Sequence, residues 1–407
     1  MNRLSRFRFS VYSILTVLVL LGGARLVLSS GFVANKVADR LEALLGVPVR
    51  VTGVDIALGG SSAVQGLQIY ERASDDLPAL PWATAEDVRV DFSAVDIFGD
   101  SMPKEVVLNG ANVELRFAEN GALLTRLPQA SDSSKSMPKL RLENARISLL
   151  QDGREAPLVV ENVNAEFTYA ERSFRFDGTC VDAVWGEWTV AGSYDTVNKV
   201  FHLELHTVRA EVTAEKLALL PFVPAKVWKA VRITAGVTPV DLDLTAGGGE
   251  RVKYRVQLKP ENTSLRITAI DLDAEQASGA VVIENSVVRL SDVKGRTANG
   301  TIATEAVLDF SSPSADLKFP VLSVDKVELQ KLPDSWGLKK FNIQGKLTGK
   351  AELFVLVKPT GVSTKGSGKG TVNVDNLPLL APVPIKLIAD KGKFRIFPTG
   401  TGLFPGL

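Results

Sequence analysis

Two histidines four residues apart, His202 and His206 in the stretch HLELH, are the residues whose spacing most resembles a metal site. On a helix, this spacing would place both imidazoles on one face, where they could bind zinc. Apolar and polar residues alternate through the stretch, however, which predicts a strand with both histidines and Glu204 on its polar outer face. We therefore expect solvated side chains here and no metal site.

Two other stretches resemble binding loops but lack the surrounding sequence that such loops need. The glycines of GSGKG, Gly366, Gly368 and Gly370, lead into the strand-like TVNV and not into a helix, so a hairpin loop is expected instead of a phosphate site. The run 271–275, DLDAE, resembles the start of a calcium loop, but Gln276 stands where the sharp turn requires glycine. We interpret its acids as outward carboxylates of a strand.

The chain has a single cysteine, Cys180, and no evident Ser-His-Asp or paired-acid constellation. An exported chain with one cysteine has no internal disulfide. We expect Cys180 to be a small buried side chain and not a nucleophile. The sequence thus predicts a protein that is not an enzyme and uses no cofactor.

The elements that carry these residues are predicted to be strands. From Pro48 onward, side chains alternate with a period of two, and turn residues recur about every 8 to 12 residues. We count about twenty strands, with turns expected at Asn120–Gly121, Glu143–Asn144 and Glu284–Asn285. The predicted fold is mainly β: an elongated, curled, mostly antiparallel sheet, groove-like or taco-like, with a few short helices.

Three segments interrupt this pattern with helical features. Apolar residues at helical spacing between Phe32 and Gly46 predict a short amphipathic helix that covers the end of the sheet or lies on a membrane. Residues 215–232 predict two short helical turns broken by prolines, and VELQKLPDSW predicts another turn ending at Pro333.

The 22 residues from Phe9 to Ser30 are nearly all apolar. As a helix they would span roughly 33 Å, enough to cross a bilayer. Arg3, Arg6 and Arg8 precede them and predict a cytoplasmic N-terminus with the rest of the chain exported. A cleaved signal peptide is the alternative. The 47 basic and 46 acidic residues nearly cancel, which disfavours a nucleic-acid partner.

A sheet with one apolar face must hide that face. A second packed sheet would do so in a sandwich, and curling would leave an apolar groove suited to acyl chains. The side chains predicted to line such a groove include the aromatic pairs expected to face each other across a turn, Phe167 and Tyr169 with Phe174 and Phe176. The full set is Val113, Leu115, Phe117, Phe167, Tyr169, Phe174, Phe176, Leu203, Leu205, Val252, Tyr254, Val256, Leu353 and Val355.

The order of these features resembles a known family. A basic stub and a single span are followed by FVANKVADRLEALLGVPVRVTGVDIALGG, AVQGLQIYE and PKEVVLNGANVELRFAENGALLTRLP, and later by LPDSWGLKKFNIQGKLTGKAEL. This arrangement is similar to the AsmA-like proteins, relatives of TamB. The resemblance implies an inner-membrane-anchored periplasmic protein associated with outer-membrane biogenesis and with phospholipid transport along an apolar β-groove.

The sequence therefore predicts a membrane-anchored protein that holds phospholipid acyl chains. One alternative is a non-catalytic assembly factor, a closed β-sandwich that binds other envelope proteins, and a weaker one is an adhesin-like surface protein. The expected segments are 1–31, a cytoplasmic stub and transmembrane anchor; 32–130, an N-terminal AsmA-like β region with its short helix; 137–214, a middle β region; 215–232, a helical interruption; and 233–407, a C-terminal β region.

Overall fold

A computed structural model describes most of the chain after residue 30. The described ranges are 31–57, 61–71, 80–91, 103–126, 138–170, 172–220, 231–248, 250–267, 271–312, 314–336, 344–358, 361–375, 381–390 and 393–399. The expected membrane segment Phe9–Ser30 lies outside these ranges. Among the described residues, none of the helices has the length and apolar character needed to span a bilayer.

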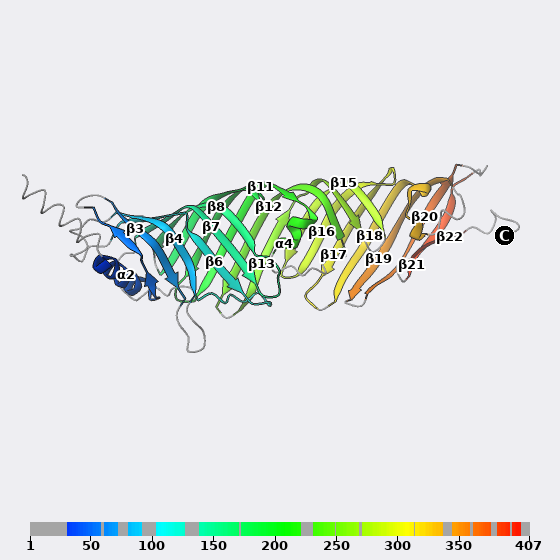
Figure 1. Ribbon diagram of the computed structural model, residues 1–407. Helices are drawn as coiled ribbons and strands as arrows, with labels where there is room; N and C mark the ends of the chain where they lie inside the picture. The colour runs from blue at the N-terminus through cyan, green and yellow to red at the C-terminus, as the bar shows by residue number, and fades with distance from the viewer. Residues whose placement is uncertain are drawn as a thin grey trace, which may run out of the picture. The chain divides into compact units, whose positions relative to one another are not determined.

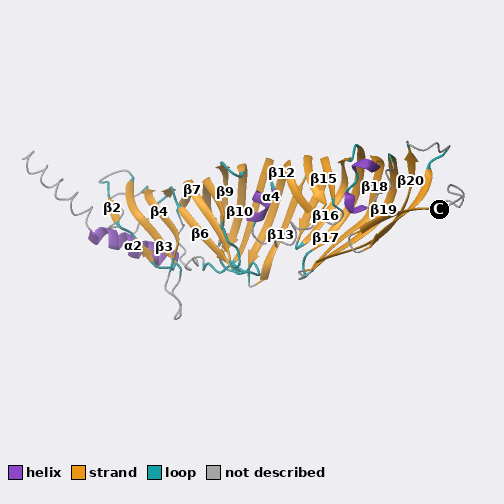
Figure 2. Cartoon of the chain, turned by 45° about the vertical axis from the view of Figure 1, so that its right-hand side comes forward, coloured by secondary structure: helices purple, strands orange, loops and turns teal. Residues whose placement is uncertain are grey.

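The described chain is mainly β, as predicted, and forms one long, mostly antiparallel sheet of 22 strands with a few short helices (Figures 1 and 2). The pairings of β5 and β6 with β7 are parallel. The described residues fall into two compact units. Unit 1 holds those within 1–184, 189–202 and 246–251, and unit 2 holds those within 185–188, 203–245 and 252–407.

Unit 1 contains one helix and the first nine strands. They are α2 (Gly31–Leu45), β1 (Val49–Arg50), β2 (Gly53–Asp55), β3 (Ser62–Tyr70), β4 (Pro81–Val90), β5 (Glu105–Asn109), β6 (Asn112–Phe117), β7 (Lys139–Gln151), β8 (Leu158–Ala170) and β9 (Ser173–Asp182). Four strands have residues in both units: β10 (Gly186–Asp195), β11 (Val200–Val212), β12 (Val231–Gly247) and β13 (Glu250–Leu258).

Unit 2 continues the series toward the C-terminus. Its elements are α4 (Ala214–Leu219), β14 (Glu261–Ile267), β15 (Leu272–Glu284), β16 (Val287–Thr297), β17 (Gly300–Asp309), β18 (Ala315–Glu328), the 3-10 turns η2 (Leu329–Lys331) and η3 (Asp334–Trp336), β19 (Gly345–Lys358), β20 (Gly361–Val374), β21 (Val383–Asp390) and β22 (Lys393–Pro398). From β14 to β22, each strand pairs antiparallel with the next one along the chain.

The helix α2 confirms the amphipathic helix predicted after the apolar N-terminal segment. It packs against β1 and β2, with Ala34 buried. Gly46 ends it with a φ of 67°, and its N–H donates to the carbonyl of Glu42 over 2.8 Å. A left-handed residue after the last helical turn is a common helix stop, and glycine adopts this conformation without strain.

The turn predicted at Glu143–Asn144 is wrong, because β7 runs straight through it. Asn144 has a φ of 53°, and the pairing register with β8 shifts between Leu142 and Ala145, as in a β-bulge. The Asn144 N–H donates to Asn164 Oδ1 over 3.0 Å. Asparagine tolerates a left-handed conformation in a bulge as well as in a turn, so the local sequence does not separate the two.

The hairpin loop predicted at Gly366, Gly368 and Gly370 is also wrong. These glycines lie within β20, and Gly366 and Gly368 pair with Leu353 and Ala351 of β19. A Cβ on Gly366 would lie 2.4 Å from the carbonyl oxygen of Glu352. Glycines at every second position therefore mark one face of a strand, where the backbone of the neighbouring strand comes close, and do not mark a loop.

The predicted helical segments are partly confirmed. α4 supplies one of the two short turns expected in 215–232, and the Thr213 hydroxyl accepts from the Lys216 N–H at its start. Pro221 and Pro224 lie outside the described residues, and β12 already begins at Val231. The single turn expected to end at Pro333 is instead two 3-10 turns, one on each side of that proline.

Candidate functional site

The face of the sheet that carries the alternating apolar side chains, here called the apolar face, is the candidate site. In unit 1, Val64, Val88, Leu108, Leu142 and Ala165 are register neighbours across β3, β4, β5, β7 and β8. All five are buried. The period-two pattern of separate strands thus adds up to one uninterrupted apolar row within the unit.

Aromatic side chains continue the apolar face of unit 1, as the sequence predicts. Phe167 faces Phe176 and Tyr169 faces Phe174 across the β8–β9 hairpin, with ring centroids 5.2 and 4.8 Å apart. The Phe176 ring also stacks on Phe201 at 5.7 Å, with an angle of 12° between the ring planes. Ring pairs at these separations stabilise a sheet beyond their buried area.

Gly192 of β10 makes room for this ring ladder. A Cβ at this position would lie 2.4 Å from Cζ of Phe176 and 2.2 Å from the carbonyl oxygen of His202. Neither distance is compatible with a side chain, because one neighbour is backbone and the other is a stacked ring. Glycine is therefore required here by close approach, and the sequence pattern alone does not reveal this.

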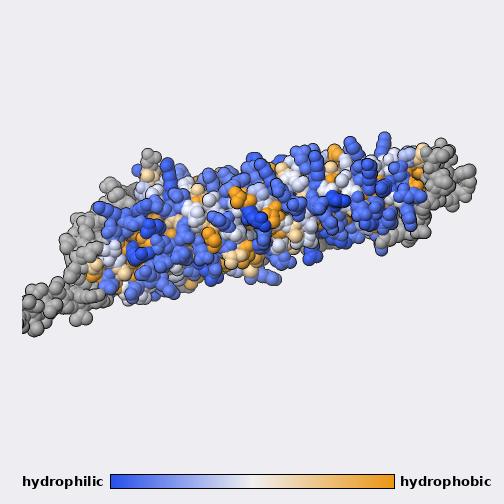
Figure 3. All heavy atoms as spheres, turned by 90° about the horizontal axis from the view of Figure 1, so that it is seen from above, coloured by the Kyte–Doolittle hydropathy of each residue, from blue (hydrophilic) through white to orange (hydrophobic). Residues whose placement is uncertain are grey.

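The predicted lining residues divide into half-buried and buried groups. Ten are half-buried: Val113, Leu115, Phe167, Tyr169 and Phe174 in unit 1, and Leu203, Leu205, Val252, Tyr254 and Val256 in unit 2. Phe117 and Phe176 are buried in unit 1, and Leu353 and Val355 are 0% and 2% exposed in unit 2. Figure 3 shows one surface of the molecule, where hydrophilic residues predominate and apolar residues form separate patches.

Leu353 and Val355 are buried because the apolar face of unit 2 is covered by protein toward the C-terminus. They belong to a core that also holds Leu317, Phe319 and Leu347. Leu329, Leu332 and Trp336 join this core from the connection between β18 and β19. We call residues 329–336 the cover segment. Its first turn, η2, contacts β19, and its second turn, η3, contacts β22.

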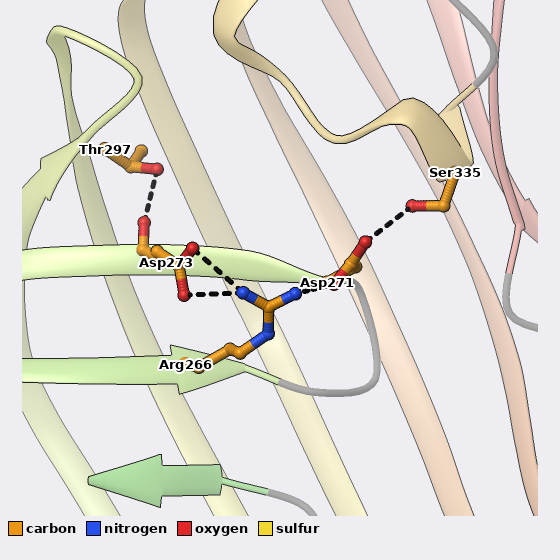
Figure 4. A network of polar contacts seen from close by, with 5 residues as sticks. All are labelled: Arg266, Asp271, Asp273, Thr297 and Ser335. Atoms are coloured by element: carbon orange, nitrogen blue, oxygen red, sulfur yellow. Dashed lines mark hydrogen bonds and ion pairs between the residues drawn. The ribbon is translucent and has the colours of Figure 1, made fainter. Parts of the chain in front are cut away.

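A polar network ties the cover segment to β14 and β15 (Figure 4). Arg266 donates from Nη1 to both carboxylate oxygens of Asp273, at 3.1 and 3.0 Å, and from Nη2 to Asp271. The Ser335 hydroxyl donates to Asp271 over 3.4 Å, and the Thr297 hydroxyl donates to the Asp273 carbonyl over 2.7 Å. The neighbouring carboxylates of Asp273 and Asp271 raise the pKa of Arg266.

This network also bears on the predicted carboxylates of 271–275. Asp273 and Glu275 are exposed residues of β15, which confirms the prediction of outward strand acids. Asp271 precedes the strand and is half-buried. Arg266 faces Asp273 across the β14–β15 pairing and also binds Asp271, so one arginine balances one of the two negative charges.

The histidines and Cys180 are the remaining candidates that the sequence singles out. His206 is exposed, as predicted, and its Nδ1 lies 2.5 Å from Asp241 Oδ1, whereas His202 is half-buried, contrary to the prediction of a solvated side chain. Cys180 is 2% exposed and its thiol donates to the Glu161 carbonyl over 3.5 Å. Burial, with a smaller contribution from Asp182, raises the pKa of this thiol to about 11. The prediction that Cys180 is a small buried side chain is confirmed.

No protein-family model, curated protein or solved structure matches this chain. The likeness to AsmA-like proteins therefore rests on the sequence features alone. Sequence reasoning missed the role of Gly192 and, although it predicted a turn within the cover segment, missed the packing of that segment on the core. For the latter no local signal exists, because Ser335 and its partner Asp271 are 64 residues apart.

Proposed function

We propose that the chain is a membrane-anchored periplasmic β-groove protein that holds phospholipid acyl chains on its apolar face, in phospholipid transport or outer-membrane biogenesis. The observation that carries the proposal is the incomplete burial of this face. Ten predicted lining side chains, such as Leu115, Phe167 and Tyr254, are half-buried, whereas Leu353 and Val355 are sealed in a core. Apolar surface left open in this way is what an acyl chain would cover.

The hydrophobic effect gives the affinity that the proposal needs. Each methylene removed from water contributes about 0.8 kcal/mol, so even six methylenes laid on these side chains gain roughly 5 kcal/mol. The residues involved are aliphatic and aromatic and make no directional bond, so the site would accept acyl chains without selecting a headgroup.

The position in the cell is also part of the proposal. The apolar run Phe9–Ser30 with its preceding arginines supports an inner-membrane anchor, a cytoplasmic N-terminus and a periplasmic body. The resemblance to AsmA-like proteins supports the same arrangement. In this setting the apolar face receives acyl chains from the membrane to which the chain is attached.

Photo-crosslinking tests the proposal. A benzophenone side chain replaces Phe167 or Tyr254 in the full chain expressed in a Gram-negative host, and matched exposed controls carry it at the adjacent Thr168 or Arg255. Neighbours in a strand point to opposite faces, so each pair differs only in the face that it samples. Phospholipid adducts are expected at Phe167 and Tyr254. Equal adducts at the controls, or adducts at none of the four positions, would refute the proposal.

A second candidate is the closed, non-catalytic assembly factor that binds other envelope proteins. The observation in its favour is the core of unit 2, where Leu317, Leu347 and Leu353 are sealed by side chains of the protein itself. Purification of the full chain with a stable protein partner and without lipid would favour this function over acyl-chain binding.

A further inference from the structure

The outward face of β19–β22 carries a row of facing lysines. Lys350 of β19 pairs in register with Lys369 of β20, and Lys369 pairs with Lys386 of β21. Lys386 in turn faces Phe397 of β22. All three lysines are exposed. Three strands thus present like charges side by side on one surface.

This arrangement differs from the rest of the outward surface. Elsewhere, basic residues meet acids across strands, as in Arg89–Glu143 at 2.6 Å and Lys139–Glu166 at 2.5 Å. Like charges directly opposite each other destabilise a sheet. Within the part of the chain that the structure describes, none of the three lysines forms an ion pair, although Glu352 lies on the same face of β19, two residues from Lys350.

Exposed aromatic rings accompany the lysines. Phe397 is 42% exposed beside Lys386, and Phe354 is 46% exposed beside Lys365. Residues 345–399 contain nine lysines and arginines against three acids, although charge is nearly balanced over the whole chain. We call the surface formed by Lys350, Lys365, Lys369, Lys386, Phe354 and Phe397 the basic face. Of its lysines, Lys365 faces the exposed Asp390 of β21 in register.

Protection of a sheet edge does not explain the basic face. Lysines on edge strands discourage unwanted pairing, but β19, β20 and β21 are each paired on both sides. A surface of lysines interspersed with exposed rings matches the interface of an anionic membrane. Lysines there attract lipid phosphates, and apolar rings enter the boundary between headgroups and acyl chains.

We propose that the basic face binds the anionic headgroup layer of a membrane. This binding is separate from the acyl-chain site, because it uses the opposite face of the strands and depends on charge. It would hold the C-terminal strands against a lipid surface. The facing lysines would then attract lipid phosphates, although their mutual repulsion weakens the pairing of the strands that carry them.

Vesicle capture tests this inference with the full chain. The protein is first inserted into phosphatidylcholine nanodiscs, so that its apolar N-terminal segment is embedded in neutral lipid. It is then floated with vesicles of phosphatidylcholine alone or with vesicles that also contain about 25% phosphatidylglycerol, which gives a moderate negative surface potential. Capture by the anionic vesicles only is expected. The triple variant Lys350→Gln, Lys369→Gln and Lys386→Gln should bind on the order of 100-fold more weakly, since each lysine near an anionic surface contributes roughly fivefold.

Two matched variants complete the test. Replacing the exposed Lys104, Lys259 and Lys294 with glutamine removes the same charge elsewhere and should leave capture unchanged. Changing the three facing lysines to arginine keeps the charge and should retain capture. Equal capture of neutral vesicles, no capture of either vesicle, or loss of capture in the Lys104, Lys259 and Lys294 control would overturn the inference. Binding of a polyglutamate peptide without vesicle capture would instead assign the basic face to an acidic protein.

Discussion

Replacing Gly192 with alanine should break the ring ladder of unit 1 and open the strands around it. The new Cβ would lie 2.2 Å from the His202 carbonyl oxygen and 2.4 Å from Cζ of Phe176, so strand or ring must shift. Overpacking of this kind costs about 1 to 3 kcal/mol, and loss of the Phe176–Phe201 stack adds about 1 kcal/mol. We expect a total near 3 kcal/mol.

Cys180 supplies the assay for this prediction. It is the only cysteine, is 2% exposed and lies on β9, the strand that carries Phe176. At neutral pH a thiol reagent should reach it only when the strands open, so the labelling rate reports the free energy of opening. A loss of about 3 kcal/mol corresponds to labelling roughly 100-fold faster in the Gly192→Ala variant.

Gly53→Ala is the matched control for Gly192→Ala. Gly53 is also a strand residue of unit 1, but its Cβ would meet only the flexible side chain of Gln65, at 3.3 Å. Its labelling rate should stay within about twofold of the wild type, since a compatible Gly→Ala change is neutral or mildly stabilising. Similar labelling rates for both variants and the wild type would refute the argument that close approach dictates Gly192.

Three further outcomes are expected from the buried groups and the cover segment. Burial raises the pKa of Cys180 in the folded state to about 11. The protonated thiol's contribution to stability should therefore be complete below about pH 8.5 and be lost as the pH rises toward 11. The urea midpoint of the wild type, compared with that of Cys180→Ala over this pH range, measures the loss. Trp336→Ala should destabilise unit 2 by about 3 to 5 kcal/mol in urea unfolding, since it empties part of the core. Arg266→Met should lower the urea midpoint far less than Trp336→Ala does, because its ion pairs are exposed to solvent; a loss as large as that of Trp336→Ala would contradict this ranking.

The strand pattern was readable from sequence where its signals were local. Phe167 and Phe176 could be paired in advance because alternation on both sides of a short turn fixes the register. The mainly-β fold followed from the same period. These predictions needed no knowledge of distant parts of the chain.

Other features could not be predicted because the same local sequence is compatible with two different backbone structures. Asn144 is left-handed in a bulge, yet the same residue type is left-handed in turns. Gly366 lies in a strand whose neighbouring backbone comes close, yet glycine runs are also typical of loops. Leu353 and Trp336 belong to one core, and sequence alone does not place the connection that carries Trp336 on that core.

Native mass spectrometry of the full chain, released gently from detergent, tests the central claim most directly. The account predicts that the wild-type chain carries additional mass equal to one or more phospholipids, and that replacing the half-buried Leu115 and Tyr254 with glutamate removes it. Replacing the exposed Arg255, next to Tyr254, and the exposed Thr168, next to the lining residue Phe167, with glutamate should leave the lipid in place. A wild-type spectrum that shows only the mass of the protein without lipid would contradict the claim that acyl chains bind the apolar face. Lipid retained equally by all variants would contradict it as well.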